Sequence, residues 1–272
     1  MKQIHYLFIA VVFIFFLSCA DDLNINQNMQ AGILRMTETT VDGDSIEQNI
    51  ELIYDADSTL IGINTMQGDF SNVNYSVEYA NDSIVSLNIT QIFNITNTET
   101  TTIYDVVFDS IIINLIANDT LQFALATSDD FVNGYREYFG PQNTLFNEVI
   151  FARGIDDNIV SMTESTTGID GQLTQTFEFT YSNYAQQAIL NSAYNPIINT
   201  NSSYDPFIGA LFNLRISEQA PLTSSQLDAN GNFIENAIEG TAITNINQQV
   251  TDLSYKLADL PLNCFRVEYT YD

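Results

Sequence analysis

Carboxylates are the most abundant groups in this sequence that could do chemistry: 34 Asp and Glu residues stand against seven Lys and Arg. Two carboxylates about 5–10 Å apart are enough for a glycoside hydrolase. The acids here gather at expected hairpin turns, and the chain has no tryptophan to form a sugar platform. The sequence therefore favours a protein that is not an enzyme, with a carboxylate-based glycoside hydrolase as the weakest of three alternatives.

The only histidine, His5, lies in an N-terminal apolar segment that we expect to be removed. The mature chain would then have no imidazole, which excludes Ser-His-Asp and Cys-His catalysis and histidine-ligated zinc. Acidic turns could offer oxygen ligands to calcium, but none completes an EF-hand loop. These turns are Asp42-Gly43-Asp44, Asp55/Asp57, Asp129/Asp130, Asp156/Asp157 and Asp228-Ala229-Asn230-Gly231. Because Asp and Gly are favoured in turns for backbone reasons, we predict no metal and no cofactor.

The N-terminal segment has the order of a secretory signal. Lys2 gives a positive start, residues 4–17 form an almost unbroken apolar run, and Ser18 precedes Cys19. The run is shorter than the ~20 residues of a transmembrane helix, which is typical of a signal peptide. Phe16-Leu17-Ser18-Cys19 resembles a bacterial lipobox, and the resemblance implies cleavage before Cys19 and diacylglycerol on its thiol. We predict a signal peptide over 1–18, lipidated Cys19 with a flexible tether over 19–31, and one β-rich domain over 32–272.

Asp21 and Asp22 stand directly after the predicted anchor. An acidic cluster at this place resembles the export signal of Bacteroidota lipoproteins to the outer face of the outer membrane; a solvated linker is the alternative. We expect an outer-membrane location, with the cell surface favoured over the periplasmic face. A net charge of −27 repels nucleic acid and anionic head groups, so a lipid anchor would hold the chain to the membrane. With Cys19 acylated, Cys264 has no partner for an intrachain disulfide.

From residue 33 onward the chain repeats one unit: a short apolar strand, an Asx-rich turn and a second apolar strand. Asn and Asp tolerate turn conformations and bond their own backbone, so these units predict hairpins. The predicted strands are residues 46–54, 59–66, 73–79, 84–93, 111–116, 121–127, 149–152 and 159–163, with a last hairpin near 253–271.

Alternation within the strands predicts a sheet with one buried face. Phe177, Phe179 and Tyr181 fall on one side, and Glu178 and Thr180 fall on the other. Residues 265–271 repeat this alternation, and Cys264 falls on their polar side. Such a sheet packs one face on a core and leaves the other at least partly wet, as antiparallel sheets do.

The pattern changes after Tyr181. Helical spacing predicts a short helix over residues 183–192, and Asp205-Pro206 supplies the N-cap and first-turn proline of a second helix. Residues 217–250 are polar and weakly patterned. The predicted fold class is mainly β: an antiparallel hairpin meander, one large twisted sheet, with a small helical insertion near residues 183–214.

Five hydroxyl residues follow an Asp at or near these turns and precede a small or branched residue: Ser45, Ser58, Ser83, Ser110 and Thr120. This form resembles the acceptor motif of Bacteroidota O-glycosylation, and the resemblance implies that these exposed hydroxyls carry sugars. The alternative, that such turns are simply built from these residue types, stays open.

Two segments carry a wider resemblance: Val77-Glu78-Tyr79-Ala80-Asn81-Asp82-Ser83-Ile84 and Val267-Glu268-Tyr269-Thr270-Tyr271-Asp272. They resemble uncharacterised Bacteroidota lipoproteins with Tyr-Asp-type β-hairpin repeats, for which no catalytic residues are known. The resemblance implies a binding or accessory protein of unknown ligand, with a glycan or an envelope protein as possible partner. A structural or assembly component of an envelope complex is the alternative.

Overall fold

The computed structural model describes residues 31–39, 45–57, 59–67, 71–168, 172–188, 204–227, 232, 238–245, 250–257 and 260–271. Residues 31–272 form one compact unit. The predicted signal peptide, Cys19 and nearly all of the predicted tether lie outside the described residues. No helix in the described ranges is long and apolar enough to cross a membrane.

The compact unit is built almost entirely of strands. They are β1 (Ala31–Thr39), β2 (Ser45–Tyr54), β3 (Leu60–Gln67), β4 (Ser71–Ala80), β5 (Ser83–Phe93), β6 (Thr98–Asp109), β7 (Ile112–Ala117), β8 (Thr120–Ser128), β9 (Phe131–Phe139), β10 (Thr144–Arg153), β11 (Ile159–Thr167), β12 (Leu173–Ala188), β13 (Gln219–Leu227), β14 (Ile238–Thr244), β15 (Val250–Leu257) and β16 (Leu260–Tyr271). Each strand pairs antiparallel with the next, which confirms the predicted mainly β meander.

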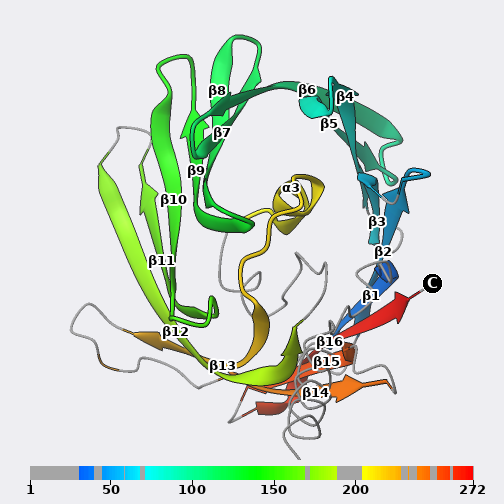
Figure 1. Ribbon diagram of the computed structural model, residues 1–272, viewed down its shortest axis with the longest axis vertical. Helices are drawn as coiled ribbons and strands as arrows, with labels where there is room; N and C mark the ends of the chain where they lie inside the picture. The colour runs from blue at the N-terminus through cyan, green and yellow to red at the C-terminus, as the bar shows by residue number, and fades with distance from the viewer. Residues whose placement is uncertain are drawn as a thin grey trace, which may run out of the picture. The chain divides into compact units, whose positions relative to one another are not determined.

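The sheet is not open. β1 pairs antiparallel with β16, from Ala31–Tyr271 to Glu38–Phe265, so the meander closes into a barrel (Figure 1). Closure pairs the first strand with the last, and neither is left as a free edge.

The hairpin turns follow the predicted Asx chemistry. Asn81 and Asp82 have φ of 52° and 61°, and Asn118 and Asp119 have φ of 51° and 60°. Positive φ at both central residues is the condition of a type I′ turn, whose twist matches that of paired strands. Asn and Asp enter this left-handed region more readily than other non-glycine residues, which explains why they recur here.

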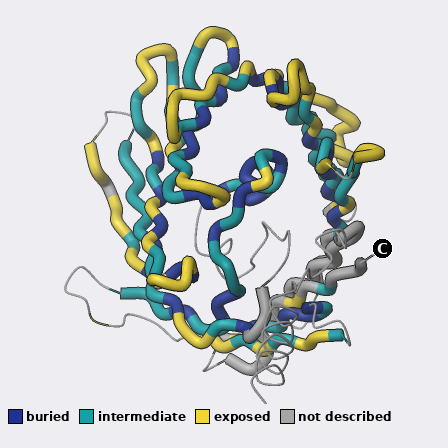
Figure 2. Tube along the Cα trace, in the orientation of Figure 1, coloured by how far each residue is buried: buried dark blue, intermediate teal, exposed yellow. Residues whose placement is uncertain are grey.

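Side chains alternate between the two faces of the barrel wall. In β7, Ile113, Leu115 and Ala117 are buried, while Asn114 between them points the other way. The strand register carries this pattern around the wall, and Figure 2 shows buried segments recurring along the strands. The inner face therefore holds the hydrophobic core. The outward positions are mostly polar, among them Asn64, Asn74, Ser76, Asn88, Thr101, Asp105, Asn114, Arg136, Glu148, Ser165, Glu178 and Ser182.

Part of the connection between β12 and β13 lies inside the ring (Figure 1). Its described part, residues 204–218, contains the short helix α3 (Pro206–Leu211); we call this part the plug. Asp205 is the N-cap and Pro206 the first helical residue, as predicted. Gly209 is required here because a Cβ at this position would collide with the Tyr204 hydroxyl.

The other predicted helix, over residues 183–192, is wrong as far as Ala188, since β12 continues to that residue. The helical spacing of Tyr184 and Ala185 was misleading because their backbone lies against β13 across an irregular register. Tyr184 also donates a hydrogen bond to the backbone of Tyr181, at 3.2 Å. Residues 189–192 lie outside the described ranges.

We predict that Asn81→Ala lowers the free energy of unfolding by about 1–2 kcal/mol. In the left-handed conformation the Cβ of alanine lies too close to a backbone carbonyl oxygen, and alanine has no polar side chain to offset this strain. Asn81→Gly should leave the free energy of unfolding nearly unchanged, because glycine adopts φ of 52° freely. Urea denaturation of both variants checks this expectation. Equal destabilisation by Ala and Gly would contradict the assigned turn.

Candidate functional site

The two ends of the barrel interior differ in what fills them. We call the end that carries the β4–β5, β6–β7 and β8–β9 turns the plug end, because the plug enters there. The opposite end, with the β5–β6, β7–β8 and β9–β10 turns, is the far end. The plug reaches the middle of the barrel, where it meets Tyr75 of β4 and Tyr135 of β9.

Asp205 fastens the tip of the plug to the wall. Its carboxylate accepts a hydrogen bond from the Tyr75 hydroxyl at 3.0 Å and from the Phe207 backbone N–H at 2.9 Å. The Phe207 ring packs on Tyr75, with centroids 5.4 Å apart. Tyr204 lies edge-on against Tyr135, with centroids 5.3 Å apart. Aromatic contacts and one charge-assisted hydrogen bond thus hold the plug at the barrel's centre.

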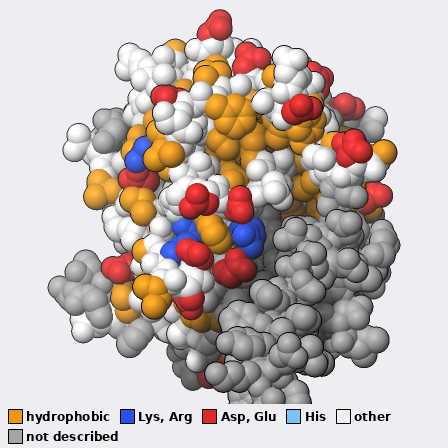
Figure 3. Space-filling model, viewed as in Figure 1, with side chains coloured by type: hydrophobic (Ala, Val, Ile, Leu, Met, Phe, Trp, Pro, Cys, Tyr) orange, Lys and Arg blue, Asp and Glu red, His pale blue; other side chains and the backbone are white. Residues whose placement is uncertain are grey.

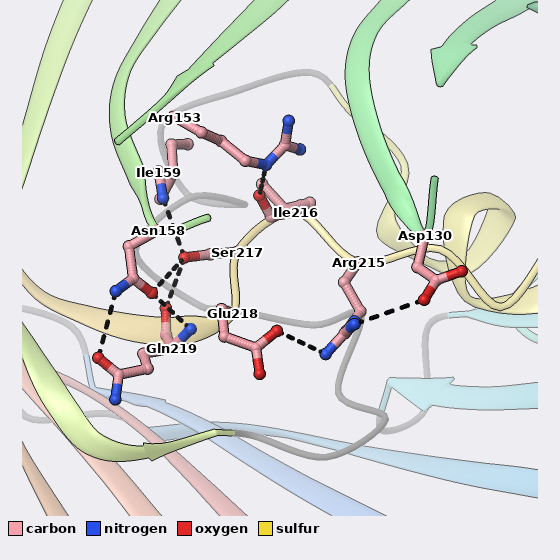
Figure 4. Close-up of polar contacts among 9 residues, drawn as sticks. All are labelled: Asp130, Arg153, Asn158, Ile159, Arg215, Ile216, Ser217, Glu218 and Gln219. Atoms are coloured by element: carbon pink, nitrogen blue, oxygen red, sulfur yellow. Dashed lines mark hydrogen bonds and ion pairs between the residues drawn. The ribbon is translucent and has the colours of Figure 1, made fainter. Parts of the chain in front are cut away.

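Two arginines hold the plug at its own end of the barrel. The guanidinium groups of Arg153 and Arg215 lie over the Phe131 ring, 4.7 and 4.9 Å from its centroid. Arg215 pairs with Glu218 at 2.7 Å and with Asp130 at 3.7 Å (Figure 4). Arg153 donates to the Ile216 carbonyl at 3.0 Å, and also bonds Asn133 and the Val132 carbonyl. Burial lowers the pKa of Arg153 to about 10, so it remains a cation at neutral pH.

A cluster of hydrogen-bonded polar side chains also holds the plug at this end (Figure 4). The side-chain oxygen of buried Asn158 accepts from the Gln219 backbone N–H at 2.7 Å, and its amide donates to the Gln219 side chain at 3.2 Å. Ser217 accepts from the Ile159 backbone N–H at 3.0 Å. In Figure 3 hydrophobic side chains gather inside the ring, next to a cluster of basic and acidic ones. The plug is therefore bonded to the wall at this end, while the inward Phe108, whose ring lies edge-on to Phe212 of the plug, is still 53% exposed.

Carboxylates line the interior beyond the plug. Asn147 of β10 donates to Glu164 of β11 at 3.1 Å, and Tyr135 donates to Glu137 of β9 at 3.0 Å. The register places Glu137, Asn147 and Thr166 side by side on the inner face. Burial raises the pKa of the Glu137 carboxyl, although hydrogen bonds from Tyr135 and Asn147 partly oppose this effect.

The inner wall at the far end stays accessible. On β6, Thr98, Thr100 and Thr102 share the inner face with buried Tyr104, and Thr98 and Thr100 are exposed. Their partners on β5 are Phe93, Gln91 and Ile89. On β12 the inward Gln175 is also exposed. Residues that point inward and yet remain exposed mark an interior that is open to solvent at this end.

The interior carboxyls, hydroxyls, amides and aromatic rings of the far end, which we call the far-end wall, are the candidate site. They are Gln91, Phe93, Thr98, Thr100, Thr102, Phe123, Glu137, Asn147, Glu164, Thr166, Gln175 and Phe177. Side chains of this kind can bind a ligand by hydrogen bonds and ring contacts.

The structure does not bring the predicted glycosylation residues together. Ser83 begins β5 and Ser110 occupies the β6–β7 turn with φ of 54°, and both are exposed. Thr120 begins β8, and its hydroxyl donates to the Asn118 carbonyl at 3.3 Å. Ser45 begins β2, and Ser58 lies outside the described residues. Glycosylation at these positions and lipidation of Cys19 remain predictions.

The predicted calcium turns do not assemble a site in the described ranges. Asp55 instead accepts backbone N–H groups of Asp57 and Thr59 within its own turn. No three His, Cys, Asp or Glu side chains of the described residues converge as metal ligands. The turns at 42–44 and 228–231 lie outside these ranges. Cys264 of β16 pairs in register with Lys256 of β15.

Sequence reasoning missed the far-end wall. One signal was present in the sequence. Glu137 lies two residues from both Tyr135 and Phe139 in β9, so it shares their face of the sheet, where alternation predicts an apolar residue. Asn147 stands in the same relation to Val149 and Phe151 in β10. Polar residues at inward-facing positions are expected where the inner wall of the barrel is exposed to solvent.

The chain is similar to a porin-like protein from Bacteroides vulgatus, at 11% identity and a TM-score of 0.48, over 89% of this chain and 99% of that one. It is also similar to a porin-like protein from Bacteroides uniformis, at 11% identity and a TM-score of 0.44, over 90% and 99% of the two chains. A LolA superfamily protein from Nitrosomonas europaea follows, with 10% identity, a TM-score of 0.23 and coverage of 88% and 82%. No protein-family model and no curated protein matches the chain.

Asp205 makes stability depend on pH. Burial raises the pKa of its carboxyl, while the hydrogen bonds from Phe207 and Tyr75 partly lower it. The folded state therefore holds the proton more tightly than the unfolded chain, whose Asp pKa is about 4. The contribution of Asp205 to stability is present at low pH and is lost as pH rises through its folded pKa.

We predict that Asp205→Asn removes this pH dependence. Asn also caps helices and can accept from Tyr75, so the plug should stay in place. As pH rises from about 4 to 8, the free energy of unfolding of the wild type should fall relative to that of the variant. Urea denaturation across this range measures the difference. The exposed turn variant Asp119→Asn is the control, and a difference between wild type and Asp205→Asn that does not change with pH would contradict the prediction.

Proposed function

We propose that this chain is a non-enzymatic lipoprotein of the bacterial outer membrane, anchored through Cys19, that binds a ligand in the far end of its barrel. One observation carries the proposal: inward polar side chains of the far-end wall, such as Thr98, Thr100 and Gln175, are exposed, whereas the inner face around the plug is apolar and bonded to the plug. Mouths of barrels are common places for ligand sites. The display of the barrel on the cell surface is part of the proposal.

The polarity of the two faces of the barrel wall favours a barrel that stands in water and binds a ligand over a channel that crosses the lipid bilayer. The outer face of a membrane-spanning barrel carries an apolar band, with polar side chains inside. Here the core faces inward, and charged residues such as Asp105, Arg136, Glu148 and Glu178 face outward. Burying these charges in hydrocarbon would cost several kcal/mol in total. The lipid on Cys19 is thus the proposed membrane contact.

The assembly alternative would be favoured by a free edge strand, because unpaired edges recruit strands. The pairing of β1 with β16 removes the edge that these strands would otherwise present. The hydrolase alternative needs two carboxyls that face each other across a bound sugar. Glu137 and Glu164 instead lie on the same wall, with Asn147 on the strand between them. We therefore place ligand binding first.

Tryptophan substitutions test the ligand site. Thr100 and Thr101 are adjacent on β6 and both are exposed, but Thr100 points inward and Thr101 outward. Thr100→Trp should obstruct the far end, whereas Thr101→Trp should not. Native mass spectrometry of protein extracted from the host envelope should show a dissociable ligand on the wild type and on Thr101→Trp. Thr100→Trp should lose most of that ligand. Equal retention by both variants would count against binding at the far-end wall.

Cys19→Ala tests the anchor separately. The wild type should partition into the detergent phase of a membrane extract, because two or three acyl chains give stable membrane association. The variant should be found in the aqueous phase or remain uncleaved. External protease should remove the wild-type barrel from intact cells if the barrel is displayed at the surface. Protection until the outer membrane is broken would place it on the periplasmic face.

A further inference from the structure

We propose that the far-end wall recognises an uncharged, hydroxyl-rich ligand, an oligosaccharide. The inference rests on the proposed function, because it names the ligand class of the same site. Three properties of the inner face support it: its hydrogen-bonding groups, its aromatic rings and its charge.

The hydrogen-bonding groups face one another around the interior. On one side, Gln91 of β5 pairs in register with Thr100 of β6. The neighbouring inward positions of β6 are Thr98, which is exposed, and Thr102, which is half-buried. On another stretch of the wall, the exposed Gln175 pairs with Thr166, which pairs with Asn147. Amides and hydroxyls both donate and accept. A ligand that presents many hydroxyls can satisfy them without carrying charge.

Aromatic rings alternate with these polar groups on the same inner face. Phe93 is 39% exposed and stands beside Gln91 along β5. Phe177 lies next to Gln175 along β12, and it pairs with Glu164. Phe123 is stacked on Tyr135, with centroids 5.8 Å apart, which fixes its ring on the wall. Rings next to amides and hydroxyls suit a sugar, whose apolar C–H face and polar rim need both kinds of contact.

The charge of the interior excludes an anion. The far-end wall contains the carboxyls of Glu137 and Glu164 and, among the described inward residues of this end, no lysine or arginine. Arg136 points outward to Glu148, at 2.6 Å. Arg153 and Arg215 are engaged by the plug at the other end. An acyl carboxylate, a phosphate or an acidic glycan would therefore meet only like charge.

The interior is wide enough for such a ligand. The closed sheet contains strands β1 to β16, and barrels of about 16 strands enclose a water-filled space that their own side chains do not fill. Below this space, the plug carries Asp205 and Phe207 at the barrel's centre. The plug thus gives the site a floor, and the far-end wall gives it sides.

The first experiment is calorimetric titration of the mature wild-type chain with uncharged oligosaccharides. The set comprises maltohexaose, cellohexaose, xylohexaose, mannohexaose and chitohexaose, with oligogalacturonate and laurate as anionic probes. We expect at least one neutral sugar to bind and both anions to fail. Gln91→Ala and Gln175→Ala should each weaken that binding roughly tenfold, the loss expected for about one hydrogen bond.

The matched control is Asn88→Ala, which removes an amide from the outer face of the same strand that carries Gln91. It should leave binding unchanged. A second readout uses Thr98→Trp, which places the chain's only tryptophan at the rim of the interior. Its fluorescence should change with the sugar that binds, whereas that of Thr101→Trp should not.

The failures are distinguishable. If laurate or the neutral dye Nile red changes the fluorescence of Thr98→Trp and no sugar does, the interior binds a ligand but the proposed ligand class is wrong. If oligogalacturonate binds as well as the neutral sugars, the charge argument is overturned. If no probe changes this fluorescence and the native protein carries no ligand, both the ligand class and the proposed function fall.

Discussion

Closure of the sheet is the constraint on which the rest of this structure depends. Once β1 pairs with β16, every inward side chain faces a common interior, and a barrel of about 16 strands is too wide for its side chains to fill. The interior must then be occupied by another part of the chain or by solvent. The plug occupies part of the interior at one end, and inward side chains of the far-end wall are exposed at the other.

The plug is held by a few polar bonds within an otherwise apolar contact. A buried carboxylate such as Asp205 is costly, and its bonds to Tyr75 and Phe207 offset part of that cost. Hydrogen bonds to a charged group are worth about 1.5–3 kcal/mol each. Arg153, Arg215 and Asn158 give similar support at the plug end. The polar contacts thus determine where the plug sits, while Tyr204 and the aliphatic side chains of the plug supply most of its buried area; the aliphatic ones are Ile208, Leu211, Leu214 and Ile216.

The hairpins and the plug helix were predictable because their causes are local. Asn81-Asp82 and Asn118-Asp119 favour left-handed turns wherever they occur, and Asp205-Pro206 favours a helix start. The strand β12 was partly misread, because Tyr184 and Ala185 fit a helical spacing that pairing with β13 overrides. β6 and β9 were not predicted as strands. Threonines on the inner face of β6 and Glu137 in β9 break the apolar alternation on which strand recognition relies.

The sequence by itself determined the mainly β composition, the hairpin meander, the helix start at Asp205 and the acidic charge of the chain. These follow from residue preferences and from contacts a few positions apart. Only the tertiary structure decided that the meander closes, that residues 204–218 run through its interior and that Gln91, Glu137 and Gln175 share one enclosed wall. The reason is physical: alternation tells which residues share a face of a sheet, but only closure of the sheet decides which face becomes the inside.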